Sequence, residues 1–183
     1  MNLKKCVLIP IIALGATFAL AAQPHGSVYF DGGVGFLPYL TYGSEVDTAL
    51  AGYYSTSRLQ LDFDVHLGER ITRGIYIVGG YDGMADEIFQ NGTFINQITS
   101  SLFSLGFRVY PLGKGLVLGV DAGLSILNGF DAFGYGVAGT VAWDFTPLGL
   151  NCEVGAKTIY IAYEDSSLPY MFAVMPFVAV LLG

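Results

Sequence analysis

The segment RLQLDFDVHL, Arg58 to Leu67, carries the residues best suited to chemistry, because Asp62, Asp64 and His66 lie two positions apart. A carboxylate beside an imidazole can move protons as a general acid or base. A buried histidine that simply hydrogen-bonds to a carboxylate has the same sequence pattern without any catalysis. We favour this second interpretation.

The rest of the chain carries no other chemical signature. The glycine-rich segments 32–36 and 129–139 lack the strand, glycine loop and helix setting of a phosphate-binding motif. No spacing of histidines, cysteines or acidic residues resembles a metal site. We therefore expect no catalytic, cofactor-binding or metal-binding residue, and we expect the protein not to be an enzyme.

Side chains of an extended strand alternate between two faces, so RLQLDFDVHL has one charged face and one apolar face. A soluble sheet would turn the apolar face inward, whereas a strand in lipid would turn it outward. The elements around this strand must decide between the two arrangements.

The first 21 residues are typical of a cleaved signal peptide. A basic start, MNLKK, precedes a short apolar stretch and a small-residue cleavage site that ends at Ala21. Without Lys4 and Lys5, the domain 22–183 has six basic and fifteen acidic residues, a net charge of −9. Such a charge argues against nucleic acid as a partner. Only Cys152 remains, so no intrachain disulfide is expected.

The remaining chain is very apolar, yet it contains no run long enough for a spanning helix. Hydrophobic residues make up 53% of the sequence and charged residues 13%. The longest apolar run, 170–182, has thirteen residues and contains Pro176, so it is too short to cross a bilayer as a helix. Such a chain either buries its apolar residues thoroughly or lies in lipid as strands.

Alternation of apolar and polar residues predicts eight strands. They cover 27–37, 57–67, 74–82, 98–110, 115–126, 133–145, 150–161 and 170–182. The connections after the second, fourth and sixth strands are short, and those after the first and third are long. This layout is typical of bacterial outer-membrane barrels with periplasmic termini. The predicted fold is an all-β, eight-stranded antiparallel up-and-down transmembrane β-barrel.

Volume decides which face lines this barrel. One face carries several dozen large apolar side chains, such as Leu59, Leu61 and Phe63, while the other carries the charged residues and many glycines. An eight-stranded barrel has room inside for modest side chains only. We therefore expect the charged face inside and the apolar face in lipid. The alternative is a soluble lipocalin-like barrel that encloses the apolar face and binds a small ligand.

The charged residues of the interior face should form a hydrogen-bonded network, because buried charges must be paired or neutralised. The predicted members are Asp31, Arg58, Asp62, Asp64, His66, Arg108, Asp121, Asp144, Glu153 and Lys157. Counting along the strands places Arg58 and Lys157 nearest the cell surface, above Asp62 and Asp64. A filled interior predicts a structural or surface-interaction role. The alternative is a small porin whose narrow path favours cations.

The two long loops are the expected contact sites for an extracellular partner, because loops on a rigid scaffold carry variable function. Their aromatic residues are Tyr39, Tyr42, Tyr53, Tyr54, Phe89 and Phe94. Tyrosines mixed with acidic residues suit protein or carbohydrate contacts, but ordinary solvated loops look much the same. The other expected partner is the lipid of the outer membrane, in which we expect a monomer.

The chain resembles the small eight-stranded outer-membrane barrels of the OmpA membrane-domain, OmpX and OmpW group. The resemblance covers the mature chain and rests on its architecture and on the stretch FRVYPLGKGLVLGVDAGLS, 107–125. There an arginine-bearing strand ends in Tyr-Pro, turns, and returns as a strand with spaced glycines. The resemblance implies the barrel fold and an outer-membrane location, and it identifies no single activity.

Overall fold

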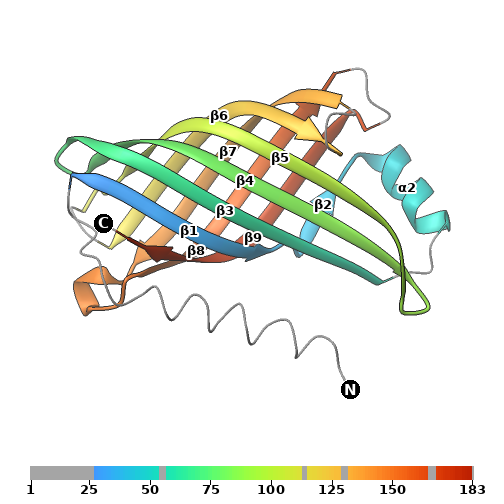
Figure 1. The fold of residues 1–183 in the computed structure, drawn as a ribbon, viewed down its shortest axis with the longest axis horizontal. Helices are drawn as coiled ribbons and strands as arrows, with labels where there is room; N and C mark the ends of the chain where they lie inside the picture. The colour runs from blue at the N-terminus through green and yellow to red at the C-terminus, as the bar shows by residue number, and fades with distance from the viewer. Residues whose placement is uncertain (1–26, 54–56, 113–114, 129–131, 165–167, 183) are drawn as a thin grey trace.

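The described part of the chain forms an antiparallel β-barrel with a short helix at one end (Figure 1). The computed structural model describes residues 27–53, 57–112, 115–128, 132–164 and 168–182. The predicted signal peptide lies outside these residues. Their elements are β1 (Val28–Phe36), β2 (Tyr39–Thr41), α2 (Ser44–Tyr53), β3 (Ser57–Thr72), β4 (Ile75–Gln90), β5 (Thr93–Val109), β6 (Leu116–Leu127), β7 (Ala132–Asp144), the 3-10 turn η1 (Thr146–Leu148), β8 (Cys152–Tyr163) and β9 (Tyr170–Leu181). No helix among them combines the length and apolar character needed to cross a bilayer.

The barrel closes between its first and last strands. Each strand from β3 to β9 pairs with the next, and β1 pairs with both β3 and β9. Pro38 interrupts the first strand, since proline has no N–H for the ladder. Beyond it, β2 continues the pairing with β9, opposite Phe172 to Val174. Because β1 and β2 form one wall, the barrel has eight walls, and the predicted eight-stranded antiparallel barrel is confirmed.

The hairpin of β4 and β5 is much longer than predicted. Residues 83–97, which we expected to form the second long loop, continue the two strands as far as a two-residue turn. Asn91 and Gly92 form this turn with φ values of 52° and 79°, the left-handed conformation that tight hairpins require. Asn-Gly between alternating segments was the overlooked signal. The prediction of a long loop here is wrong.

The first long connection also contains regular structure that the sequence reading missed. It forms β2 and then the ten-residue helix α2. Asp47 fixes the start of this helix, because its carboxylate accepts hydrogen bonds from the Tyr42 N–H and the Thr41 hydroxyl. Val46 and Leu50, one helical turn apart, pack against the apolar interior at this end of the barrel. Figure 1 shows α2 at the end opposite the C-terminus, which we call the loop end.

The charged face of the strands points into the barrel and the apolar face points outward, as the volume argument predicts. On β3, Asp62 and Asp64 are 2% and 1% exposed, whereas Phe63 between them is 51% exposed. The same outward orientation holds on the other strands. Their exposed apolar residues include Val34, Phe36, Phe103, Leu105, Phe107, Val120, Leu124, Tyr135, Val137, Val141, Trp143, Val154, Tyr160 and Val178.

The interior contains more large apolar side chains than the sequence reading expected. Toward the loop end, a cluster that includes Leu102, Ile159, Ile161 and Met171 fills the barrel. Toward the opposite end, where β1 begins and β9 ends, a second cluster is built from aromatic and aliphatic residues. Its members are Tyr29, Tyr76, Val78, Tyr110, Val117, Ala142, Phe177, Ala179 and Leu181. The charged residues lie between these two apolar clusters or at their margins.

Glycine makes room for these side chains at specific points. A Cβ on Gly106 would lie 2.2 Å from an Asp121 carboxylate oxygen, and one on Gly80 would lie 2.2 Å from the His66 ring. Both glycines sit on strands that neighbour the strand carrying the charged residue. Glycine at these positions therefore allows a charged side chain to lie flat against the adjacent strand.

Candidate functional site

Between the two apolar clusters lies a group of buried charged residues, which we call the charged layer. Lys157 lies at its centre. Its ammonium group donates hydrogen bonds to Asp64 and to Asp82 Oδ1, the latter at 2.6 Å, and lies 3.5 Å from Asp62 Oδ2. The Phe177 ring lies beside it, with the ring centroid 5.5 Å from the nitrogen. Lys157 and the three carboxylates are all at most 2% exposed. One buried cation therefore holds strands β3, β4 and β8 together across the interior.

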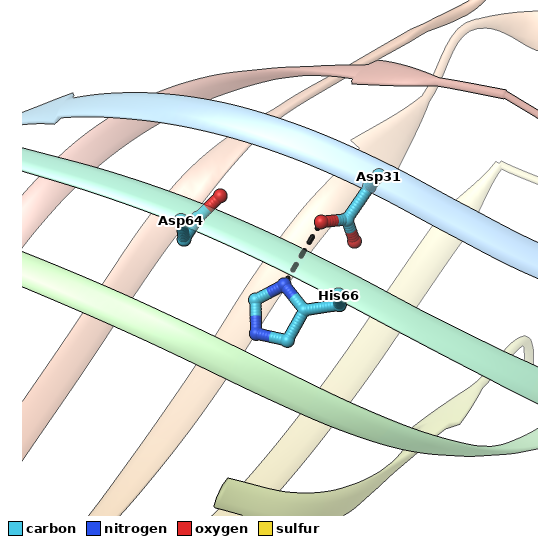
Figure 2. Close-up of side chains that lie close together, drawn as sticks. All are labelled: Asp31, Asp64 and His66. Carbon is cyan, nitrogen blue, oxygen red and sulfur yellow. Dashed lines mark hydrogen bonds and ion pairs between the residues drawn. The ribbon is translucent and has the colours of Figure 1, made fainter. Parts of the chain in front are cut away.

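His66 is the second centre of this layer. Its Nδ1 atom lies 2.8 Å from Asp31 Oδ1, which fixes the orientation of the ring (Figure 2). The Tyr29 hydroxyl donates to the other oxygen of Asp31. All three residues are at most 3% exposed. The carboxylate and phenol thus hold the imidazole in one position.

Two further groups of charged residues lie toward the end of the barrel where β1 begins and β9 ends. Arg108 donates from Nη1 to both carboxylate oxygens of Asp121, each at 2.8 Å. Glu153 accepts a hydrogen bond of 3.2 Å from the Tyr110 hydroxyl. Asp144 accepts one of 2.7 Å from the backbone N–H of Thr146, in the turn between β7 and β8. The Asp144 contact attaches this end of the interior to the turn.

A third group lies near α2 at the loop end. Arg58 donates to both oxygens of Asp86, with 3.0 Å between Nε and Oδ1. The Tyr42 hydroxyl donates to Asp86 Oδ2 at 3.1 Å, and the guanidinium lies over its ring. Burial and the negative charge of Asp86 both raise the pKa of Tyr42, so its phenol stays protonated as a donor. The group ties the start of the α2 segment to the barrel wall.

The structure places all ten residues of the predicted network inside the barrel. Nine are buried, and the Arg58 side chain is 26% exposed at the loop end. The predicted height of Lys157 is wrong, because its ammonium group reaches the carboxylates of Asp62 and Asp64 rather than a level above them. The strands of a barrel are tilted, so counting residues from a turn does not give the height of a side chain.

Asp82 and Asp86 belong to the interior but were missing from the predicted set. Both are 1% exposed and take part in the two ion-pair groups described above. Their positions follow from the long β4, in which even-numbered residues from Tyr76 to Ile88 point inward. Continued alternation past Asp82 was the signal that could have identified them.

The aromatic residues predicted for surface contacts differ in their exposure to solvent. Tyr39 is 55% exposed and Phe94 is 52% exposed, and Phe94 packs against Phe89 across the β4–β5 hairpin. Tyr42 is 1% exposed and bonded to Asp86, so the prediction of a surface contact there is wrong. The reason is that β2 turns this side chain into the barrel mouth. Tyr53 ends α2, and Tyr54 lies outside the described residues.

The described interior carries a large excess of negative charge. Eight carboxylates are at most 3% exposed, whereas the cations that face them are Arg58, Arg108 and Lys157. Several carboxylate oxygens of the charged layer also have no hydrogen-bond partner among the described residues. A buried arrangement of this kind can hold strands together and can attract cations or protons.

Comparisons with known proteins place the fold but not the function. No protein-family model and no curated protein matches the chain. Among solved structures, the barrel is similar to the Yersinia pestis outer membrane protein Ail, whose backbone structure was determined in a phospholipid bilayer nanodisc. The TM-score is 0.55 at 9% sequence identity, over 84% of this chain and 99% of the other. At this identity the likeness concerns the fold.

Proposed function

We propose that this chain is an integral outer-membrane barrel with a closed interior, which serves a structural or surface-interaction role and catalyses no reaction. The observation that carries this proposal is the combination of an apolar outer surface with an interior filled by side chains. Large apolar residues such as Leu105, at 62%, and Val120, at 57%, are exposed on the outside. In water, a protein with such a surface would aggregate, whereas the hydrocarbon of a lipid bilayer solvates it.

The filled interior supports this role over that of a porin. An open path would have to pass both apolar clusters as well as the charged layer. The space bordered by His66, Arg108, Glu153 and Lys157 measures about 10 Å³, which is roughly the room of one water molecule. At the loop end, Tyr42 and Leu37 are buried across the mouth. Ions would therefore find no continuous water-filled route.

The same features argue against a soluble lipocalin-like binder. A ligand cavity needs a few hundred cubic ångströms lined mainly by apolar groups. Here the apolar interior of the loop half is packed with side chains, with Leu102, Ile159 and Met175 each at 0% exposure. The wall that such a binder would turn to water carries exposed phenylalanines and leucines instead.

The first prediction is that the folded protein shows no stepwise conductance in planar lipid bilayers. The expected result is a flat current trace at both polarities, because the interior is occupied along its whole length. A porin recorded in the same membranes supplies the positive control. Gel migration of the recovered protein with and without boiling verifies that the inserted chain is a folded barrel. Ohmic openings by folded protein would contradict the closed interior and favour the small-porin alternative.

A role in surface contacts would use the part of the barrel that extends beyond the apolar belt. The tip of the β4–β5 hairpin carries exposed polar residues such as Gln90, Asn96 and Gln97, together with Phe94. A hairpin that projects on a rigid wall is pre-organised for binding, which lowers the entropic cost of association. This feature supports the surface-interaction role without naming a partner.

A further inference from the structure

Asp62 is the carboxylate of the charged layer that has the weakest contact with a cation. It is 2% exposed, yet neither of its oxygens accepts a hydrogen bond from the described residues. The Lys157 ammonium lies 3.5 Å from Asp62 Oδ2, but it donates its hydrogen bonds to Asp64 and to Asp82 Oδ1. Asp62 is therefore the third carboxylate around a cation that bonds to the other two.

The neighbours of Asp62 on three other strands are apolar. On β1 it faces Gly35, where a Cβ would lie 3.4 Å from Asp62 Oδ2 and 3.1 Å from the sulfur of Met175 on β9. On β4 its partner in the register is Met84. The small space described above is bordered by Asp64 and not by Asp62, so a water molecule there would contact the other carboxylate. These neighbours provide little compensation for a negative charge on Asp62.

The charged groups that face Asp62 leave an excess of negative charge. Asp64 lies on the same strand, Asp82 on β4 and Lys157 on β8, so three carboxylates share one ammonium group. The other basic side chains of the described interior are engaged in the pairs Arg58–Asp86, Arg108–Asp121 and His66–Asp31. Two buried negative charges around Lys157 therefore have no cation of their own, which is strongly unfavourable in a low-dielectric interior.

The atoms without hydrogen-bond partners around Asp62 are all acceptors. They are both oxygens of Asp62, Asp64 Oδ1 and Asp82 Oδ2. Oxygens of the three carboxylates lie within 4.8 Å of one another. Asp62 Oδ2 and Asp64 Oδ1 also lie on the same side, against Gly35 and Gly33 of β1. An ionised carboxylate only accepts hydrogen bonds, so these oxygens can bond to each other only when one of them carries a proton.

We propose that Asp62 takes up one proton from water as the barrel folds and is a neutral carboxylic acid in the folded protein at neutral pH. Its O–H then donates to Asp64 Oδ1 after a small side-chain rotation. The proton removes one of the two excess negative charges. Lys157 keeps the two ionised carboxylates to which it is bonded, Asp64 and Asp82.

The proton makes the stability of the barrel depend on pH in a defined direction. In the unfolded chain Asp62 is in water and is ionised above about pH 4, as an ordinary aspartate is. The folded state then binds one more proton than the unfolded state, so the free energy of unfolding falls as the pH rises. This loss ends once the pH is high enough to ionise Asp62 in the folded barrel.

The first test compares the full chain with its Asp62→Asn variant, both refolded into phospholipid bilayers and unfolded with guanidinium at a series of pH values. Asparagine has the shape of the neutral acid but needs no proton to fold. The folding equilibrium constant of the variant, divided by that of the unmodified chain, should therefore rise about tenfold per pH unit from about pH 5 to neutral. At neutral pH the variant should be the more stable protein.

The second test is infrared spectroscopy of the folded protein in the same bilayers at neutral pH. The C=O stretching band of a neutral carboxylic acid is separate from the bands of ionised carboxylates. We expect this band in the unmodified chain, and Asp62→Asn should lower it by the intensity of one acid. Gel migration with and without boiling shows that each sample is a folded barrel.

Asp86→Asn is the matched control for both tests. It removes an equally buried carboxylate, which accepts hydrogen bonds from Arg58 and Tyr42. It should leave the acid band unchanged, and its stability relative to the unmodified chain should not rise with pH in this range. An Asp62→Asn variant that fails to fold, that is less stable than the unmodified chain at neutral pH, or that keeps the full acid band would overturn the proposal.

Discussion

Replacing Leu105 with arginine should destabilise the barrel in phospholipid bilayers by about 2–4 kcal/mol, the cost of an arginine near the middle of the membrane. Leu105 is 62% exposed on the outer wall and lies half-way along the part of β5 that pairs with β6. An arginine there would have to leave water for hydrocarbon. Guanidinium unfolding, followed by the fluorescence of Trp143, the single tryptophan, measures the change.

Leu148→Arg is the matched control for this substitution. Leu148 is 73% exposed, but it lies in η1 between β7 and β8, at the end of the barrel. Near the interface the same change should cost only about 0–1 kcal/mol. If the wall met water instead, both substitutions would fall within about 0.5 kcal/mol of the unmodified chain. Equally small changes in the free energy of unfolding for the two variants would therefore contradict the membrane assignment.

Replacing Lys157 with methionine should lower the free energy of unfolding by about 3–5 kcal/mol, because it leaves buried carboxylates without their cation. Asp62, Asp64 and Asp82 surround the ammonium group and are almost fully buried. Methionine keeps a similar side-chain length, so the effect reports the lost charge rather than a cavity. The measurement uses guanidinium unfolding in bilayers.

Two companion variants separate charge from packing in this experiment. Adding Asp82→Asn to Lys157→Met removes one of the uncompensated charges and should recover part of the lost stability. Arg58→Met removes a cation whose side chain is 26% exposed at the loop end, so its cost should be clearly smaller. A loss below about 1 kcal/mol for Lys157→Met would show that the carboxylates do not depend on this lysine.

The strands and the direction of their side chains could be predicted from the sequence. An extended chain alternates its side chains every two residues, and this alternation is a local property that survives in any barrel. The inward orientation of Asp62 and Asp64 followed from it once the small interior volume excluded the large apolar face. The length of the β4–β5 hairpin was underestimated because Asn91-Gly92 was not recognised as a tight turn.

The partners within the interior could not be predicted in the same way. Lys157 on β8 meets Asp64 on β3 and Asp82 on β4, strands that are not its neighbours in the sheet. Such contacts cross the lumen, and their heights depend on strand tilt and on the register at closure.

The sequence by itself determined that this chain forms eight alternating strands with an apolar and a charged face, because periodicity and side-chain volume are readable along the chain. Only the tertiary structure decided which charges meet, since closing a tilted sheet brings distant strands to the same level. It also decided that apolar clusters close the interior at both ends and that α2 lies at the loop end. These features depend on packing in three dimensions, which spacing along the chain does not specify.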